Sequence, residues 1–468
     1  MKAKVSKTYL VFIAVLTAIA ATVALTSCQT GGESSSQRTT AAASAATQDE
    51  AAAATLPEGS GSAKLTESDI AVNETIENAE DGGHAIVADG ETLSYANVRV
   101  NKTGEADGDE ADFYGENAAV FATNGGTLTL KDMVVKTDGT HANAVFSYGE
   151  GTTVNIANAY IETSGNCSGG LMTTGGGTMN AENLTINTSG NSSAAIRSDR
   201  GGGTVNVTGG NYTTSGTGSP VIYSTADITV SDATMTSTAS QGVVVEGKNA
   251  VTLNNVNLTA DNNKKNSDKS SRYQAVMIYQ SMSGDAAEGA SRFAMNGGTL
   301  TNQNGDVFFI NNTATEITLN NAQITNNGNG VFLRAAAAGW GSEGSNGGQV
   351  TLNASNQIIN GDMIVDSVSH LNLYLSNNAS FTGAINSSGQ DGEVYVEIED
   401  GSIWTLTGDS YITGMTCGAN AINLNGHKLF IDGTSYTEGS ASFGNPIEVQ
   451  STGNGHGGGN PPAKPEND

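Results

Sequence analysis

The chain has 468 residues, of which 60 are glycine and 6% are aromatic, and its formal net charge at pH 7 is −27. So large an excess of acidic residues would repel phosphate backbones, which argues against nucleic acid as a partner. The length alone would allow two or three domains, but the internal repeat favours one solenoid, since a solenoid grows by adding coils.

Residues 1–27 have the features of a signal peptide. Lysines at positions 2, 4 and 7 precede an apolar run over residues 9–25, an arrangement typical of a signal peptide rather than of a membrane span. Residues 25–28, Leu-Thr-Ser-Cys, resemble the lipobox of bacterial lipoproteins. The resemblance implies cleavage before Cys28 and lipid attachment to its sulfur, and hence a membrane anchor. An ordinary secretory signal followed by a chance cysteine is the alternative.

Three further segments follow this signal. Residues 28–63 are mostly Ser, Thr, Ala, Gln and Gly, a composition that predicts a flexible tether. Residues 64–450 contain the repeat and are expected to form the folded part. Residues 451–468 include Gly-Gly-Gly and Pro-Pro and are expected to form a disordered tail.

A short pattern recurs six times between Thr127 and Ala260. Each copy opens with an apolar, a polar and an apolar residue, the alternation of a strand with one buried face. An Asp, Asn or Gly follows two residues later, and these residue types tolerate the left-handed conformation of a sharp turn. A second apolar position and then a third short run complete the copy. The first apolar residues are Leu128, Val154, Met179, Val205, Ile228 and Val251, with spacings of 26, 25, 26, 23 and 23 residues.

The repeat predicts an all-β, single-stranded parallel β-helix. One coil of three short strands cannot bury its own apolar residues, whereas stacked coils share a continuous core. Equivalent strands would then pair in parallel, about 4.8 Å apart. A propeller blade would need about 40 residues. Counting the interrupted copies, we expect roughly a dozen coils; the later first strands are expected at Phe293, Ile317, Val350, Leu373, Val396 and Ile422.

The third strand of each coil has the most informative outward positions. Stacking should place equivalent side chains in one ladder, which mixes aromatic residues, arginines and carboxylates on a flat face. Aromatic rings can stack on sugar rings, and Arg, Glu and Asn can bond their hydroxyl groups, so the ladder suggests glycan binding; a solvated sheet face is the alternative. The expected ladder is Phe121, Phe146, Met172, Arg197, Tyr223, Glu246, Tyr279, Asn311, Arg334 and Asp366.

Two insertions favour the binding interpretation. Residues 281–292 follow Tyr279, and residues 335–348, which include Trp340, follow Arg334. Long loops in a compact repeat are common sites of function, and these two could wall a cleft. We therefore predict ligand-binding roles for Arg197, Tyr223, Glu246, Tyr279, Asn311, Arg334 and Trp340. A third insertion, residues 262–272, holds four basic side chains and is expected to be a solvated loop.

A fourth insertion, residues 104–116, is rich in carboxylates. Calcium takes six to eight oxygen ligands, so Asp107, Asp109 and Asp112 are candidate Ca²⁺ ligands. The spacing differs from that of an EF-hand loop, and an acidic surface loop is the alternative. Apart from this possible Ca²⁺ site, the sequence indicates no cofactor.

The repeats over residues 84–448 resemble right-handed β-helix, pectate-lyase-like proteins. More narrowly, residues 111–119, 195–203 and 278–285 resemble adhesin-like surface proteins of gut bacteria. The resemblance implies a right-handed solenoid exposed at the cell surface. Pectate lyases hold Ca²⁺ with acidic residues on neighbouring coils, whereas Asp199, Glu246 and Asp366 are scattered here, so the resemblance supports the fold and location more than a lyase reaction.

The expected function is that of a lipid-anchored, extracytoplasmic surface protein. Its expected partners are a polysaccharide, a cell-surface glycan or a protein, together with the membrane through the anchor. The alternative is a polysaccharide lyase or glycoside hydrolase acting in a cleft on the same face, which would require two carboxylates, or bound Ca²⁺ with a nearby arginine, at one sugar bond.

Overall fold

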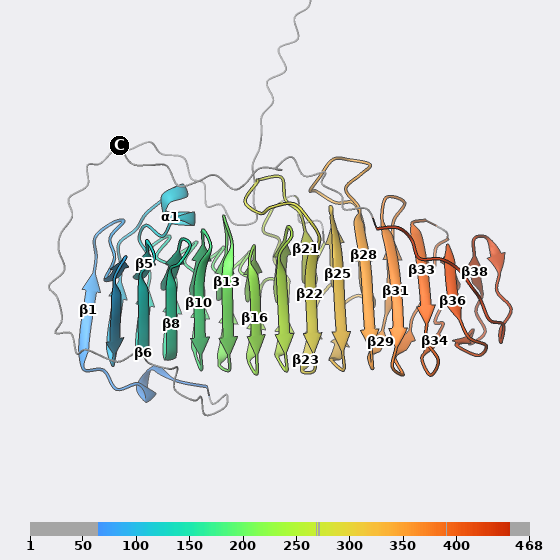
Figure 1. The fold of residues 1–468 in the computed structure, drawn as a ribbon, viewed down its shortest axis with the longest axis horizontal. Helices are drawn as coiled ribbons and strands as arrows, with labels where there is room; N and C mark the ends of the chain where they lie inside the picture. Colours follow the sequence, from blue (N-terminus) through green and yellow to red (C-terminus); the bar gives the residue numbers. More distant parts are fainter. Residues whose placement is uncertain (1–63, 268, 270–271, 390, 450–468) are drawn as a thin grey trace, which may run out of the picture.

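The computed structural model describes residues 64–267, 269, 272–389 and 391–449, and within them the chain forms a parallel β-helix of about a dozen coils (Figure 1). This confirms the predicted all-β solenoid. The predicted signal peptide, Cys28, the predicted tether and the predicted C-terminal tail lie outside the described residues.

The coils contribute strands to three parallel rows, of which the first two continue almost to the C-terminal end and the third ends at β30 (Asp362–Val365). The first row contains β3 (Thr92–Ala96), β6 (Thr127–Thr137), β8 (Thr153–Thr163), β10 (Gly177–Glu182), β13 (Gly203–Thr208), β16 (Asp227–Ser231), β19 (Ala250–Asn254), β22 (Ser291–Asn296), β25 (Thr313–Asn320), β28 (Gly348–Ser355), β31 (His370–Ser376), β33 (Glu393–Ile398) and β36 (Gly414–Cys417). The strands β6 and β8 continue through the first corner into the second row.

The second row begins at β1 and continues along the same direction. Its strands are β1 (Glu74–Asn78), β4 (Val98–Lys102), β11 (Thr185–Thr188), β14 (Asn211–Thr214), β17 (Thr234–Ser237), β20 (Asn257–Ala260), β23 (Thr299–Asn302), β26 (Gln323–Asn326), β29 (Ile358–Asn360), β32 (Ser380–Thr382), β34 (Ile403–Thr405) and β37 (Ile422–Asn423).

The third row forms a separate sheet. Its strands are β2 (Ile86–Asp89), β5 (Val120–Thr123), β7 (Val145–Tyr148), β9 (Leu171–Thr174), β12 (Ile196–Ser198), β15 (Ile222–Ser224), β18 (Val243–Glu246), β21 (Gln274–Tyr279), β24 (Asp306–Asn311), β27 (Val331–Ala335) and β30 (Asp362–Val365). A small sheet of β35 (Ser410–Ile412), β38 (Leu429–Ile431) and β39 (Thr434–Ser435) lies at the C-terminal end.

The core is a continuous column of apolar side chains inside the coils. Val205 pairs in register with Met179 and Ile228, and all three are at most 1% exposed. The polar residue between the apolar ones points outward, and Asn206 Nδ2 donates to Asn180 Oδ1 at 3.0 Å. The outer side of the first row is therefore held by hydrogen bonds between coils.

The first corner uses the left-handed conformation that the sequence predicts. Asp132, Asn158, Asn183 and Asn255 have φ angles of 53°, 52°, 53° and 53°. Asn183 Nδ2 also donates to Asn158 Oδ1 at 2.9 Å, so the corner residues are bonded to one another up the stack. Asn suits this position because its short polar side chain tolerates positive φ.

We expect Asn158→Val to destabilise the protein by about 1–3 kcal/mol, because a β-branched residue is strained at positive φ. The same change also removes the amide that bonds Asn183. Asn158→Gly should cost less, because glycine adopts this conformation without strain. Urea unfolding of the two variants tests this, and equal midpoints for Val and Gly would contradict it.

One predicted first strand belongs to another row. Ile422 lies in β37, which pairs with β34 in the second row, whereas β36 continues the first row. Alternation of apolar and polar residues shows which side of a strand is buried, but it does not distinguish one row from another.

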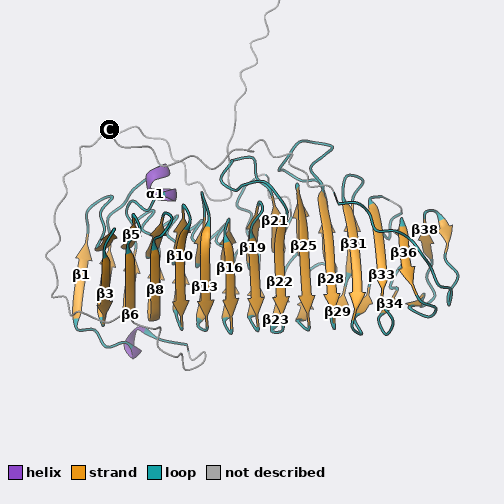
Figure 2. Ribbon diagram, viewed as in Figure 1, coloured by secondary structure: helices purple, strands orange, loops and turns teal. Residues whose placement is uncertain are grey.

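Helix is scarce in the described part of the chain. The two helical segments are η1 (Glu67–Asp69) and α1 (Asp109–Phe113), and no described helix is long and apolar enough to span a membrane. Figure 2 shows α1 and the longest loops along the same edge of the solenoid, with η1 at the opposite edge. That crowded edge is where the candidate site lies.

Candidate functional site

The predicted ladder residues all lie on the third row of strands, but their side chains form two adjacent lines along it rather than one. Arg197 pairs with Tyr223, and Tyr223 pairs with Val244 rather than with Glu246. Glu246 instead pairs with Tyr279, which pairs with Asn311. Arg334 pairs with Phe309, in the same line of side chains as Arg197. Because side chains alternate with a period of two, the two-residue difference in register leaves every predicted residue on the same side of the sheet.

The expectation of an open ladder face is wrong. Arg197, Tyr223, Glu246, Tyr279 and Asn311 are each at most 1% exposed. Alternation in the sequence predicts which side of the sheet a residue occupies, but it does not show whether an inserted segment folds back over that side. Here the insertions do so, and the buried apolar side chains on the outer face of the third row form two further, smaller clusters.

The last two insertion loops cover the middle of this face. Trp340, 1% exposed, packs against Tyr279 with ring centroids 5.0 Å apart and planes at 62°. Asn311 Nδ2 donates to the carbonyl oxygens of Ala336 and Asn346, at 3.1 and 2.7 Å. Trp340 and Asn311 thus fix the loop of residues 336–347 to the sheet, and in the structure they face protein rather than solvent.

Tyr223, Glu246 and Tyr279 form a buried cluster beneath residues 280–290. The Tyr223 and Tyr279 hydroxyls both donate to Glu246 Oε2, the latter at 2.8 Å. Burial raises the pKa of Glu246 above its ordinary value, and it raises the pKa of both tyrosines well above 10. Both phenols therefore remain protonated and available to bond the carboxyl group at neutral pH.

Arg197 is the centre of a buried ion-pair cluster. Its Nη2 lies 2.8 Å from Asp199 Oδ2 and 3.0 Å from Asp112 Oδ1. Burial raises the pKa of Asp199 to about 7, although the Arg197 charge opposes the rise. The cluster joins segments that are far apart in the sequence, since Asp112 belongs to α1.

The acidic insertion pairs with arginine. Asp112 contacts Arg197, and Asp109 Oδ2 lies 2.8 Å from Arg200 Nη1. Asp107 Oδ1 accepts a bond from the Gly108 amide at 2.9 Å. No group of three His, Cys, Asp or Glu among the described residues is placed to hold a metal ion. The structure therefore does not bring the three predicted Ca²⁺ ligands together.

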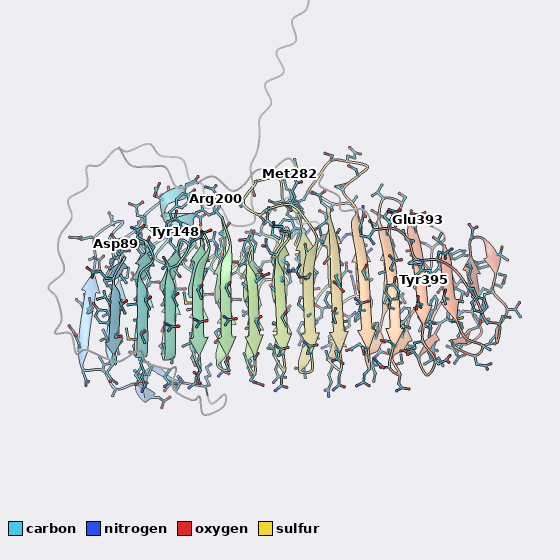
Figure 3. All side chains as sticks on the ribbon, in the orientation of Figure 1. Asp89, Tyr148, Arg200, Met282, Glu393 and Tyr395 are labelled. Atoms are coloured by element: carbon cyan, nitrogen blue, oxygen red, sulfur yellow. The ribbon has the colours of Figure 1, made fainter. Side chains whose placement is uncertain are left out.

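Arg200 connects the two segments that rise above the sheet. Its Nε lies 2.7 Å from Asp285 in the loop after β21, and its Nη1 bonds Asp109 in α1. Its guanidinium carbon also stacks 3.6 Å from the centroid of the Phe113 ring. One side chain thus holds α1 and the loop of residues 281–290 apart at a fixed spacing. Figure 3 places Arg200 on the same edge as Tyr148 and Met282.

A groove of about 860 Å³ runs beside Arg200, over the corners between the third and first rows. Its floor crosses six consecutive coils, from Glu150 to residues 285–292. At about 4.8 Å per coil, the floor is roughly 25 Å long. Tyr114 and Tyr148 line one end, with ring centroids 5.8 Å apart and planes at 75°. The volume is typical of a ligand site.

The middle of the floor is made of glycine. Gly175 and Gly201 stack in successive coils at φ 62° and 81°, and a Cβ on Gly201 would lie 2.8 Å from the Gly175 Cα atom. Side chains are therefore excluded by both the conformation and the close stacking. A ligand in the groove would contact backbone atoms, which are rigid donors and acceptors.

The lining of the groove is electrically balanced although the chain is strongly acidic. It contains three basic side chains and three acidic ones, which are Arg200, Lys248, Arg292, Glu150, Asp227 and Asp285. Asp285 is already paired with Arg200, and Arg292 lies 3.7 Å from Asp227. A lining with balanced charges suits an uncharged ligand better than a highly charged one.

Sequence reasoning missed this groove. The Gly-Gly-Gly runs at 175–177 and 201–203 are visible in the sequence and do mark corners, but nothing in them shows that adjacent coils leave a space. Tyr114 lies in the acidic insertion, residues 104–116, but is not among the predicted site residues. None of the seven predicted ligand-binding residues lines the groove. Arg334, the last of them on the third row, has its Nε 2.7 Å from Asp306 Oδ2.

The raised pKa of Asp199 predicts a pH-dependent stability. The ordinary pKa of an unfolded Asp is about 3.9, whereas burial raises the folded value to about 7. The folded state therefore holds this proton more tightly, so this contribution to stability is complete below about pH 4 and is lost as the pH rises through 7. The raised pKa of Glu246 acts in the same direction.

We expect Asp199→Asn to flatten the part of the stability profile between about pH 4 and 7, because amide and carboxyl are similar in shape but the amide does not titrate. Thermal unfolding of both proteins across this range measures the effect. Identical profiles would contradict the assignment to Asp199.

Comparison of the chain with protein-family models, with curated protein sequences and with solved structures found no match in any of the three. The described architecture is that of a parallel β-helix, and the narrower resemblances remain predictions.

Proposed function

We propose that the protein is a lipid-anchored cell-surface protein that binds a glycan in the groove over the corners between the third and first rows. The observation that carries the proposal is the groove itself: about 860 Å³, extended across six coils, floored by glycine and walled by two segments. An elongated groove of this kind fits a chain-like ligand better than a compact one.

The chemistry of the lining supports a saccharide. Tyr148 is half-buried and packs edge-on against Tyr114, and an aromatic ring offers an apolar face to the C–H side of a sugar. Backbone groups and the balanced charges of the lining can bond hydroxyl groups. The surface location is supported by the signal-like segment and Cys28.

An enzymatic role has less support from the groove. Of the three carboxylates in the lining, Asp285 is bonded to Arg200 at 2.7 Å and Asp227 lies against Arg292, which leaves Glu150 as the one lining carboxylate with no ion pair among the described residues. A glycosidase needs one carboxyl group able to donate a proton and a second able to act as a base or nucleophile. We therefore favour binding without cleavage.

A glycan array probed with the full-length protein, followed by product analysis for every hit, tests the proposal. We expect binding to one class of neutral oligosaccharide, with no shortened products. Absence of any hit would contradict glycan binding. Release of shortened products would show that the protein is an enzyme that cleaves the glycan.

A further inference from the structure

The outward side of the second row has no charged side chain along nine consecutive strands of the described chain, from β11 to β34. Its outward residues are Thr, Asn, Gln, Ser and Ile, and we call this stretch the neutral face. The first row in the same coils differs, although it is built from the same repeat. Its outward side carries Glu182, Asp227, Arg292, Glu316 and Glu397.

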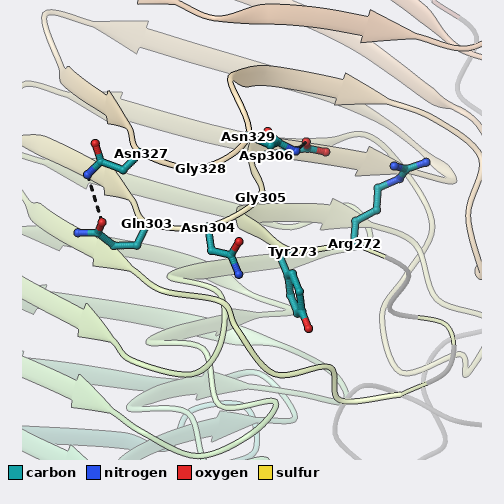
Figure 4. Close-up of a pocket in the computed structure, with 9 residues that line it drawn as sticks. All are labelled: Arg272, Tyr273, Gln303, Asn304, Gly305, Asp306, Asn327, Gly328 and Asn329. Carbon is teal, nitrogen blue, oxygen red and sulfur yellow. Dashed lines mark hydrogen bonds between the residues drawn. The ribbon is translucent and has the colours of Figure 1, made fainter.

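Threonine side chains form a line along the neutral face. The line follows the pairing of β14, β17, β20, β23 and β26 and consists of Thr213, Thr236, Thr259, Thr301 and Thr325. Neighbouring polar groups are bonded from coil to coil: Thr299 Oγ1 donates to Asn257 Oδ1 at 3.0 Å, and at the edge of the face Asn327 Nδ2 donates to Gln303 Oε1 at 3.1 Å (Figure 4). Side chains held in this way lose little conformational entropy when a partner binds.

Exposed apolar side chains lie at one end of the neutral face. Ile358 is 63% exposed and Ile403 is 39% exposed, and they are two of the few large apolar side chains that the described chain leaves in solvent. Ile358 pairs with Ser380, which pairs with Ile403, so both isoleucines belong to one line of side chains. Burying them against a partner would be favourable.

Charged side chains return at the borders of the neutral face. In the coil before β11, Glu162 Oε2 lies 3.4 Å from Lys136 Nζ. Asp261 follows β20 at the corner between the second and third rows. An uncharged centre within a charged rim is the composition of a protein–protein interface, since charged residues are depleted from the core of such surfaces.

The charge of the chain favours a second copy as the partner. With a net charge of −27 on each chain, most approaches between two copies are repulsive. The first row presents carboxylates, and the outer face of the third row is covered by the insertions. The neutral face avoids this repulsion, and it is also self-complementary, because hydroxyl and amide groups both donate and accept hydrogen bonds.

The size of the neutral face is sufficient for a weak dimer. Nine strands at about 4.8 Å spacing, each three or four residues wide, cover roughly 500 Å² per copy and 1,000 Å² in total. This is about the least area that a specific interface needs. We therefore expect a dissociation constant of about 1–100 µM.

We propose that the neutral face is an interface between two copies of this chain. The copies pack face to face and antiparallel, with a two-fold axis near β23, the middle strand of the nine. The groove lies over the corner opposite the second row, so the dimer presents both grooves on its outside. Dimerisation does not depend on the ligand proposed for the groove.

Sedimentation equilibrium of the full-length protein tests this proposal. Cys28→Ala in every sample, with a reducing agent, excludes association through a lipid chain or a disulfide. The wild type should form dimers. Their dissociation constant should fall at least threefold as NaCl is raised from about 0.1 to 1 M, because salt shortens the Debye length from about 10 to 3 Å and so screens the repulsion between the two chains.

Substitutions at Thr301 test where the copies meet, because this residue lies beside the proposed two-fold axis. Thr301→Glu and Thr301→Lys should each weaken dimerisation at least tenfold, since either brings two like charges together. Thr301→Gln should dimerise like the wild type. Thr252→Glu is the matched control, because Thr252 is an equally half-buried outward residue on the first row, and it should also dimerise like the wild type.

Unchanged urea midpoints for the Thr301 variants would show that any loss of dimer does not come from misfolding. The proposal is overturned if the wild type remains monomeric at roughly 1 mM, or if Thr301→Glu and Thr301→Lys both dimerise like the wild type. It is also overturned if Thr252→Glu weakens the dimer as much as Thr301→Glu does, because the loss would then come from total charge rather than from this face.

Discussion

Replacing Arg197 with methionine is expected to lower the free energy of unfolding by about 3–5 kcal/mol, the usual cost of breaking a buried ion pair. Arg197 is 1% exposed and lies 3.0 Å from Asp112 and 2.8 Å from Asp199, which are 3% and 0% exposed. Without the guanidinium, two buried carboxylates lose their shared counter-charge. The effect should be greatest in α1, because Asp112 is the residue of α1 that Arg197 holds.

Urea unfolding together with hydrogen exchange of residues 109–113 measures the effect and its location. Arg99→Met is a matched control, because Arg99 pairs with Glu67 at 2.7 Å on the surface, where such pairs contribute about 0–1 kcal/mol. A further variant, Arg197→Met with Asp112→Leu and Asp199→Leu, should recover most of the stability, since it leaves no charge unpaired. Equal losses for Arg197→Met and Arg99→Met would contradict this account of the cluster.

The second large effect is expected at Arg200, where methionine should weaken glycan binding in the groove at least tenfold. Arg200 bonds Asp109 on one wall and Asp285 on the other, at 2.8 and 2.7 Å. Methionine retains an apolar contact with Phe113 but bonds neither wall, so the spacing of the walls is no longer fixed. Affinity depends on such preorganisation as well as on contact area.

Arg292→Met is the control for charge, because Arg292 also lines the groove but its side chain is 57% exposed and its ion pair is long, at 3.7 Å. We expect a smaller loss of affinity for Arg292→Met and little change in hydrogen exchange of either wall. An Arg200→Met protein that binds the glycan like the wild type would show that the walls do not depend on this residue.

Much of the fold follows from the sequence because a stacked repeat obeys local rules. The alternation around Val205 predicts a strand and its buried side, and the Asn at 158 and 183 predicts the corner, where both residues have positive φ. Each of these features depends only on residues within one coil and on the coil above it. The row to which Ile422 belongs does not follow from the sequence, since it depends on the path of the chain through the later coils, where the repeat is interrupted.

The candidate site was less predictable because it depends on segments that leave the repeat. The sequence places Arg197, Tyr223 and Tyr279 on the outer side of one sheet, and this is confirmed by their register. It contains no periodic signal for where residues 104–116 or 281–292 fold, and those segments bury the ladder. The groove lies between these segments, above Gly175 and Gly201.

The groove is tested most directly by filling it. Ala290 is an exposed alanine in its lining, so Ala290→Trp should occupy the space without removing any bond of the fold. Thr325→Trp, at an exposed position on β26 in the second row, is the matched control. Measured by calorimetry with the best glycan from the array, Ala290→Trp should lose binding and Thr325→Trp should bind like the wild type; equal affinity in both variants would contradict binding in the groove.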